Sequence, residues 1–254
     1  MRLPRPRIKN CCIHVTHRCH KREFLLGCDL DRRIYRNRLS QAVKLFPAIR
    51  LLNYVITSNH VHLLMHVPRM CDLSQFMKWL QGTAAGDINR RQKREGAFWK
   101  GRFQATLVET DSHLSRCLFY LDMNMVRAKV VRHPDEWNFG GARELLGQRK
   151  RYRIIDQKCL LKFLPIPDAE HFRQWYWQTL NELCRRNGDI PGEPFWSSSL
   201  AVGSRQWIEE LVGEDLEARR SVVPVVPNDT EHTCRLKVSQ SVYRRLLKRW
   251  HNMA

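Results

Sequence analysis

The chain has 254 residues, 43% of them hydrophobic and 9% aromatic, which is enough for a packed core and excludes wholesale disorder. No apolar run reaches the roughly 18–20 residues of a membrane span, and the opening MRLPRPRIKN lacks the apolar centre of a signal peptide. Lys and Arg total 44 against 25 Asp and Glu, a net charge of +19. Composition therefore predicts a cytoplasmic protein with no membrane partner. A polyanion such as nucleic acid is the expected partner, because neutralising phosphates releases condensed counterions.

The first half of the chain alternates β-prone runs with helical segments. We expect strands at 11–19, 50–57 and 61–67 and within 97–110, and helices at 30–46, 73–93 and 112–131. This order predicts an α+β domain whose antiparallel sheet is covered by helices on one face.

Beyond about residue 150 the composition predicts a mostly helical C-terminal extension. Helical patterns occupy 150–183 and 204–220, and the basic run QSVYRRLLKRW (240–250) predicts a further short helix. The segment VVPVVPNDT (222–230) is expected to be an extended linker, since proline is disfavoured in helices and central strands. We accordingly divide the chain into a domain at 1–147, a helical accessory region at 148–220, and a linker with a basic tail at 221–254.

The run SNHVHLLMHV (58–67) contains two histidines separated by one residue. Side chains at positions i and i+2 of a strand point to the same face, so His60 and His62 can present two ring nitrogens to one cation. The pattern is short, and by itself it also fits two hydrogen-bonded polar residues near a strand end.

A second candidate motif is FYLDMN (119–124). On a helix Tyr120 and Asn124 lie one turn apart on the same face. A tyrosine phenol can attack phosphorus, and an asparagine carbonyl oxygen can complete the coordination of a divalent ion. By itself the segment also fits an amphipathic helix that uses the tyrosine as core filler.

Taken together and in order, NHVHLL, GAFWKGRFQATLVETD and YLDMNMVRAKVV resemble the single-tyrosine HUH transposases, and especially the REP-associated tyrosine transposases of bacteria. The resemblance spans residue 11 to about residue 140. It implies that 1–147 is a ferredoxin-like HUH endonuclease domain. The final helix of that family typically reads Y-I-x-x-N-P-V-R-A-G-L-V, and here Met125 and Lys129 replace the usual proline and glycine.

The resemblance also implies an activity. Tyr120 becomes the nucleophile, His60 and His62 become metal ligands, and Asn124 becomes the expected third ligand for Mg²⁺ or Mn²⁺. The implied reaction cleaves and rejoins single-stranded DNA near REP-like hairpins through a 5′-phosphotyrosine intermediate. Two alternatives stay open: a domesticated nucleic-acid-binding protein without catalysis, and a metal-dependent nuclease that uses water instead of Tyr120.

Basic residues form two candidate DNA-binding clusters. They are Arg18, Lys21 and Arg22, and then Arg90, Arg91, Lys93, Arg94, Lys100 and Arg102. Phe98, Trp99 and Phe103 interleave with the second cluster and could either stack on unpaired bases or pack in the core. The basic tail could contact DNA, return over the active site or dock as an amphipathic helix. We expect single-stranded or hairpin DNA as the partner, a nucleoid-associated location in bacteria, and either a monomer or a homodimer.

Overall fold

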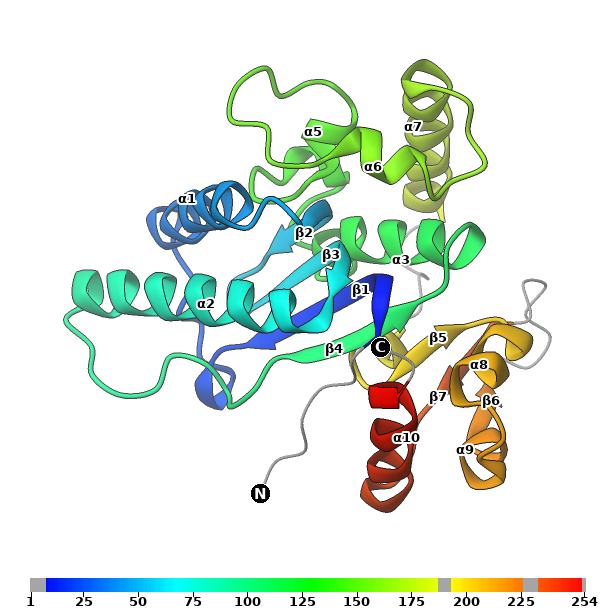
Figure 1. The fold of residues 1–254 in the computed structure, drawn as a ribbon. Coiled ribbons are helices and arrows are strands. Elements are labelled where there is room, and N and C mark those ends of the chain that lie inside the picture. The colour runs from blue at the N-terminus through cyan, green and yellow to red at the C-terminus, as the bar shows by residue number, and fades with distance from the viewer. Residues whose placement is uncertain (1–7, 187–192, 226–232, 253–254) are drawn as a thin grey trace.

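A seven-stranded sheet runs through the residues that the computed structural model describes, which are 8–186, 193–225 and 233–252 (Figure 1). The strand order is β2-β3-β1-β4-β5-β7-β6. The first four strands are β1 (Lys9–Arg18), β2 (Arg50–Ile56), β3 (His60–Arg69) and β4 (Gln104–Val108). β1 pairs antiparallel with β3 and β4, and β2 pairs antiparallel with β3. The predicted α+β fold is confirmed, and the order β2-β3-β1-β4 is that of the ferredoxin-like arrangement.

Two long helices cover one face of these strands. They are α1 (Asp29–Leu45) and α2 (Met70–Gln92), as predicted. Their buried faces, which include Tyr35 and Phe76, pack against strand residues of one parity, among them Leu63 and Met65. The two helices lie side by side on the sheet (Figure 1).

The opposite face of the sheet is also covered, where the sequence predicted helices on one face only. The covering helices are α3 (Ser112–Asp122), α4 (Asn124–Arg127) and α7 (Ala169–Arg185). They pack against Leu52, Val55 and Leu64, whose neighbours along the strands face α1 and α2. The central strands are apolar on both sides, and a second helical layer is therefore required to bury them.

The helix expected at 112–131 is shorter than predicted. Met123, with ψ near 0°, separates α3 from α4, although its amide still donates to the Phe119 carbonyl at 2.9 Å. Helical structure ends at Arg127, and Lys129 adopts a φ of 57°. That left-handed conformation is disfavoured for residues other than glycine, and glycine is what the related family often has at this position.

The C-terminal extension is mostly helical but also continues the sheet. The short helix α5 (Ala142–Leu145) precedes it. Besides α7, the extension contains α6 (Gln157–Leu161), η3 (Pro194–Ser197), β5 (Ala201–Gly203), α8 (Arg205–Val212), α9 (Leu216–Arg220), β6 (Val222–Pro224), β7 (Cys234–Leu236) and α10 (Gln240–Asn252). β5 pairs parallel with β4. The segments expected to be a helical region and a linker therefore contribute strands, and Pro224 lies on the last strand of the order, where an edge position tolerates it. Residues 226–230 of the expected linker fall outside the described residues.

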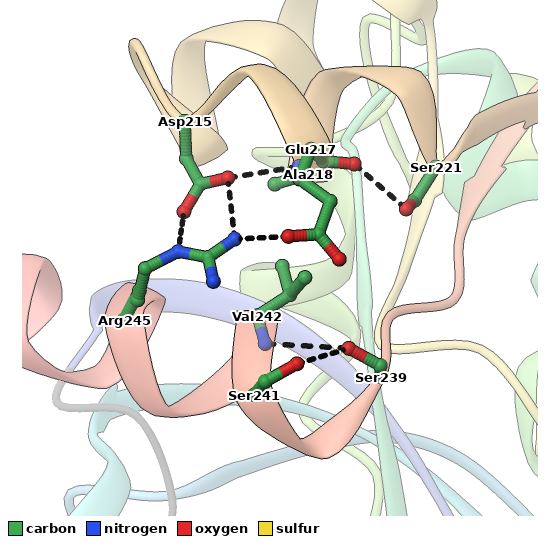
Figure 2. Close-up of polar contacts among 8 residues, drawn as sticks. All are labelled: Asp215, Glu217, Ala218, Ser221, Ser239, Ser241, Val242 and Arg245. Atoms are coloured by element: carbon green, nitrogen blue, oxygen red, sulfur yellow. Dashed lines mark hydrogen bonds and ion pairs between the residues drawn. The ribbon is translucent and has the colours of Figure 1, made fainter.

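The basic tail docks as an amphipathic helix. Val242, Leu246 and Trp250 of α10 are buried. Figure 2 shows the Arg245 guanidinium between two carboxylates at the start of α9, 2.8 Å from Asp215 and 2.7 Å from Glu217. Within the described parts of the chain, no helix is both long and apolar enough to cross a bilayer.

Candidate active site

The fold brings the predicted site residues together although the chain separates them widely. The rings of His60 and His62 on β3 lie 4.8 Å apart between centroids. The Tyr120 ring on α3 lies 5.9 Å from His62. The Asn124 amide nitrogen at the start of α4 lies 3.4 Å from His62 Nε2. All four side chains therefore gather where β3 meets the break between α3 and α4.

The hydrogen bonds of His62 determine its tautomer. His14 on β1 lies beneath it, and His14 Nδ1 donates to the Trp196 carbonyl oxygen at 2.9 Å, because a carbonyl can only accept. In a neutral His14, Nε2 must then accept from His62 Nδ1, 2.8 Å away. The remaining nitrogen of His62, Nε2, consequently carries a lone pair and can bind a cation.

The tautomer of His60 is fixed in a similar way. The Thr57 hydroxyl donates its one proton to the His60 carbonyl oxygen at 2.8 Å, so it can only accept from the ring Nδ1 at 2.9 Å. Asn59 Oδ1 lies 2.7 Å from the same Nδ1. The turn between β2 and β3 therefore holds a proton on Nδ1 and leaves the Nε2 lone pair of His60 for a ligand.

Burial keeps these imidazoles neutral. Desolvation, reinforced by the positive charge of Arg18 and by His14, lowers the pKa of His60 to about 3. Desolvation also lowers the pKa of His62 well below its ordinary value, and the neighbouring His60 and His14 add to this effect. Desolvation likewise lowers the pKa of His14 to about 4, although its bond to Trp196 raises it. Neutral imidazole is the form that binds metals, so the histidines are in the right state at neutral pH.

The residues present fit a divalent cation. Among the described residues, no group of three His, Cys, Asp or Glu side chains forms a metal site. The candidate set is instead two imidazole lone pairs and the Asn124 amide, whose oxygen can replace its nitrogen by rotation about the last side-chain bond. Mixed nitrogen and oxygen ligands suit Mn²⁺, and Mg²⁺ is also compatible when water and phosphate oxygens complete the shell.

Tyr120 is largely buried, and its surroundings act on its phenol in opposite directions. Burial raises the pKa of Tyr120, whereas Arg127 and a hydrogen bond with the Ser197 side chain lower it. The Arg127 guanidinium lies 4.5 Å from the ring centroid and donates to the Tyr120 carbonyl at 2.7 Å. Arg127 therefore holds a positive charge beside the candidate nucleophile.

Sequence patterns did not identify His14, Thr16 or Arg127 as site residues, although signals for them exist. His14 and Thr16 alternate on β1, and Thr16 lies opposite His62 in the sheet register. Arg127 follows Tyr120 and Asn124 at helical spacing. Trp196 and Ser197 had no such signal, because they lie far beyond the motifs in the chain.

The first basic cluster lies next to the histidines. Arg18 is paired with His60 in the sheet register, and its carbonyl accepts from the Lys100 amide at 2.8 Å. Lys21 and Arg22 are exposed in η1 (His20–Arg22), which follows β1. This cluster therefore places exposed positive charge beside the histidines.

The second basic cluster is divided between exposed and ion-paired residues. The Arg91 guanidinium binds buried Asp31 through two bonds of 2.6 Å and so joins α2 to α1. Arg94 lies 3.3 Å from Glu23, and Arg90, although exposed, lies 3.3 Å from Asp87. Lys93, Lys100 and Arg102 are exposed.

The interleaved aromatic residues pack in the interior. Phe98 is buried, and Phe103 packs against the same core. Trp99 stacks on His17 with centroids 4.6 Å apart and donates through Nε1 to the Gln81 carbonyl at 3.0 Å. Core packing therefore accounts for these side chains better than stacking on bases does.

A comparison with known protein families finds one that is similar in sequence to part of this chain. Residues 7–124 match the family model described as IS200-like transposase, a span that contains all four predicted site residues. Over this span, which is less than half of the chain, the sequence is similar to that transposase family. A comparison with curated proteins finds no match.

Two solved structures are similar to this chain. One is a REP-associated tyrosine transposase bound to a REP hairpin, which is 16% identical with a TM-score of 0.49 over 58% of this chain and 86% of that one. The other is a transposase candidate from Deinococcus radiodurans R1, which is 18% identical with a TM-score of 0.35 over 47% of this chain and 92% of that one.

Proposed function

We propose that this chain is a single-strand DNA transposase of the REP-associated type, which cleaves and rejoins DNA near hairpins through a 5′-phosphotyrosine on Tyr120. The similarity of residues 7–124 to the IS200-like transposase family supports the reaction class. The observation that carries the assignment to residues is the approach of Tyr120 to within 5.9 Å of His62, with Asn124 3.4 Å from His62 Nε2.

The proposed reaction exchanges one phosphodiester bond for another in each of its two steps. The Tyr120 oxygen attacks the scissile phosphorus and loses its proton, the bond from phosphorus to the 3′ oxygen breaks, and that oxygen leaves as a 3′-hydroxyl after taking up a proton. Attack by another 3′-hydroxyl reverses these steps and releases the phenol. Rejoining therefore needs no external energy source, because one phosphodiester is exchanged for another.

Protein groups would stabilise the charge that develops on the phosphate. His60, His62 and Asn124 would hold a divalent metal, which when bound polarises the phosphate. Arg127 is half-buried beside the Tyr120 ring, and a cation in this position stabilises phenolate character. Arg18 lies at the exposed end of β1, where it can neutralise a neighbouring backbone phosphate.

The proposal predicts a protein–DNA adduct that depends on one phenolic oxygen. Wild-type protein incubated with Mn²⁺ and a labelled single-stranded hairpin from the flanks of its own gene should yield a shifted band on a denaturing gel. Tyr120→Phe should abolish that band and keep the shift on a native gel, because only the nucleophilic oxygen is removed. Tyr152→Phe, at a residue that is 79% exposed, is the matched control and should form the adduct normally.

The same experiment separates the alternatives. Free 5′-phosphate products without an adduct would indicate a nuclease that uses water. Binding without cleavage, unaffected by Mn²⁺, would indicate a DNA-binding protein without catalytic activity.

A further inference from the structure

An open cavity of about 480 Å³ lies between α1 and the segments on either side of α5. Its volume falls within the usual range of small-ligand sites. Four arginines line it, and none of them belongs to the two basic clusters named above. They are Arg33 and Arg36 on α1, Arg143 on α5 and Arg149 in the loop after α5. We refer to it as the arginine cavity.

The two arginines of α1 lie on the face of that helix that points away from the sheet. Arg33 and Arg36 follow the spacing i, i+3, i+4 and i+7 together with Asn37 and Ser40, which also line the cavity. This spacing places all four side chains on one side of a helix. Tyr35 on the opposite side is fully buried in the core against the sheet. The arginine cavity is therefore separated from the core by the helix itself.

Neutral oxygens hold three of the guanidinium groups in place. Arg143 donates to Asn138 Oδ1 at 2.6 Å, and Arg149 donates to the carbonyl oxygen of the same asparagine at 2.8 Å. Arg36 donates to the Tyr152 carbonyl at 3.3 Å. The Nε groups of Arg36 and Arg149 are buried, and no acceptor for them exists among the described residues. Since a guanidinium has five N–H donors, these contacts orient the arginines and leave both charge and donors for an anion.

Carboxylates do not balance the charge of the arginine cavity. Of the residues that line it, four are arginines and one, Asp29, is acidic. Asp29 forms an ion pair with Arg32 at 2.8 Å. Glu144 of α5 is buried, and its Oε1 accepts from the backbone amides of Ile154 and Ile155. Both carboxylates thus have other partners, and the cavity keeps a net positive charge.

The arginines act on one another electrostatically. Burial lowers the pKa of the Arg149 guanidinium, although Tyr54 and Glu144 raise it. The positive charges of Arg36 and Arg143 lower the pKa of Arg149 further. These guanidinium groups therefore repel each other, and an anion bound among them would relieve the repulsion.

The arginine cavity adjoins the turn between β2 and β3, which carries His60 at its end. The Ile56 amide, just before this turn, donates at 2.9 Å to the carbonyl of Phe139, which lines the cavity. Asn59, within the turn, donates to the Arg22 carbonyl at 3.3 Å. The exposed cations of η1 and the arginine cavity are therefore both attached to the same turn.

We propose that the arginine cavity is a second phosphate-binding site, separate from the candidate active site. Planar guanidinium groups match phosphate oxygens because each can donate two parallel hydrogen bonds. The phosphate groups would belong either to the backbone of bound DNA or to a free phosphate compound. The DNA source rests on the proposed function, whereas the site itself does not.

The first arm of the test titrates full-length protein with inorganic pyrophosphate in a calorimeter, without divalent metal. Arg36→Gln with Arg149→Gln should weaken the affinity at least tenfold, because several charge-assisted hydrogen bonds are lost. Arg33→Gln with Arg143→Gln removes the other two guanidinium groups and should weaken it similarly. Two independent double variants keep the test decisive if one of them folds poorly, which circular dichroism reveals.

A matched control removes the same charge from ion-paired arginines. Arg38 lies on α1 as well, but it pairs with Asp87 of α2, and Arg245 pairs with Asp215. Arg38→Gln with Arg245→Gln should therefore bind pyrophosphate as tightly as the wild type. This comparison separates binding in the arginine cavity from general attraction to a basic protein.

The second arm identifies the source of the phosphate. Native gel shifts with the labelled hairpin at several salt concentrations give the slope of log affinity against log salt. If the backbone of DNA occupies the arginine cavity, Arg36→Gln with Arg149→Gln should lower this slope by about 0.7–0.9 for each phosphate no longer neutralised. The control double variant should keep the wild-type slope.

Each combination of results has one meaning. A lower hairpin slope supports the site with the DNA backbone as its ligand. Weaker pyrophosphate binding with an unchanged hairpin slope supports the site with a free phosphate compound as its ligand. Pyrophosphate affinity and hairpin slope that equal those of the control in both cavity variants overturn the site. Failure of the wild type to form the Tyr120 adduct overturns the proposed function alone, since the pyrophosphate titration does not depend on it.

Discussion

At the scale of single residues, His14 acts on the candidate site without being one of the proposed metal ligands, because it sets the tautomer of His62. It accepts from His62 because its other nitrogen must donate to a backbone carbonyl, and this direction leaves the His62 lone pair outward. Thr57 acts on His60 in the same way. In both cases a backbone carbonyl, which can only accept, fixes the direction of the neighbouring hydrogen bond and so keeps a proton on Nδ1 of the histidine.

Replacing His14 should therefore weaken metal binding without removing a ligand. We expect His14→Phe to lower Mn²⁺ affinity about tenfold to a hundredfold, because His62 loses the acceptor that holds its tautomer. Isothermal titration calorimetry with Mn²⁺ alone measures this change. His171→Phe alters an exposed histidine paired with Asp168 and should leave the affinity unaltered. Equal affinities for wild type and His14→Phe would show that the tautomer of His62 does not depend on His14.

At the scale of elements, a buried polar network joins three parts of the fold just behind the nucleophile. Asp122 at the end of α3 accepts from Asn53 of β2 at 2.9 Å and from the Tyr176 hydroxyl of α7 at 2.6 Å. Burial raises the pKa of Asp122 to about 7, although both hydrogen bonds lower it. The network fixes the end of α3, where Tyr120 lies, against the sheet and the second helical layer.

Removing one donor from this network should destabilise the protein. Tyr176→Phe is expected to lower the free energy of unfolding by about 1.5–3 kcal/mol, the usual range for a buried hydrogen bond to a charged group. Urea denaturation followed by circular dichroism measures the decrease. Tyr152→Phe removes an exposed hydroxyl and should change stability by less than about 0.5 kcal/mol. A decrease for Tyr176→Phe no larger than for Tyr152→Phe would contradict this role of the network.

At the scale of the whole molecule, the basic residues behind the net charge of +19 fall into two groups, ion-paired and exposed. Some of these residues form ion pairs that hold elements together, such as Arg91 with Asp31 and Arg245 with Asp215. The exposed cations after β1 lie beside the histidines instead. Under the proposed function these exposed cations would follow a DNA backbone into the site.

Salt dependence should distinguish these two groups of cations. In Lys21→Gln with Arg22→Gln, the slope of log affinity for single-stranded DNA against log salt should fall by about 0.7 for each phosphate that the protein no longer neutralises. The matched control is Arg38→Gln with Arg245→Gln, which removes the same charge from residues already paired with Asp87 and Asp215. Native gel shifts at several salt concentrations measure both slopes. Identical slopes for the two double variants would rule out a phosphate-binding role for the residues after β1.

The sequence alone determined the local secondary structure and the resemblance of its ordered motifs to a known family. Alternation and helical spacing depend on neighbouring residues, so the strands at 11–19, 50–57 and 61–67 and the long helices α1 and α2 were predicted close to their observed bounds. His60, His62, Tyr120 and Asn124 were predicted as site residues because their motifs, taken together and in order, resemble a family, whereas each short motif by itself also fitted a structural role.

Only the tertiary structure decided what surrounds those four residues. His14, Arg127 and Ser197 reach the site because β1 lies next to β3, α4 continues α3, and the extension returns along β4. It also decided that helices cover both faces of the sheet, and that the expected linker supplies a strand, β6. Contacts between residues distant in the chain depend on burial of surface across the whole fold, and no local pattern encodes which distant segment will provide them.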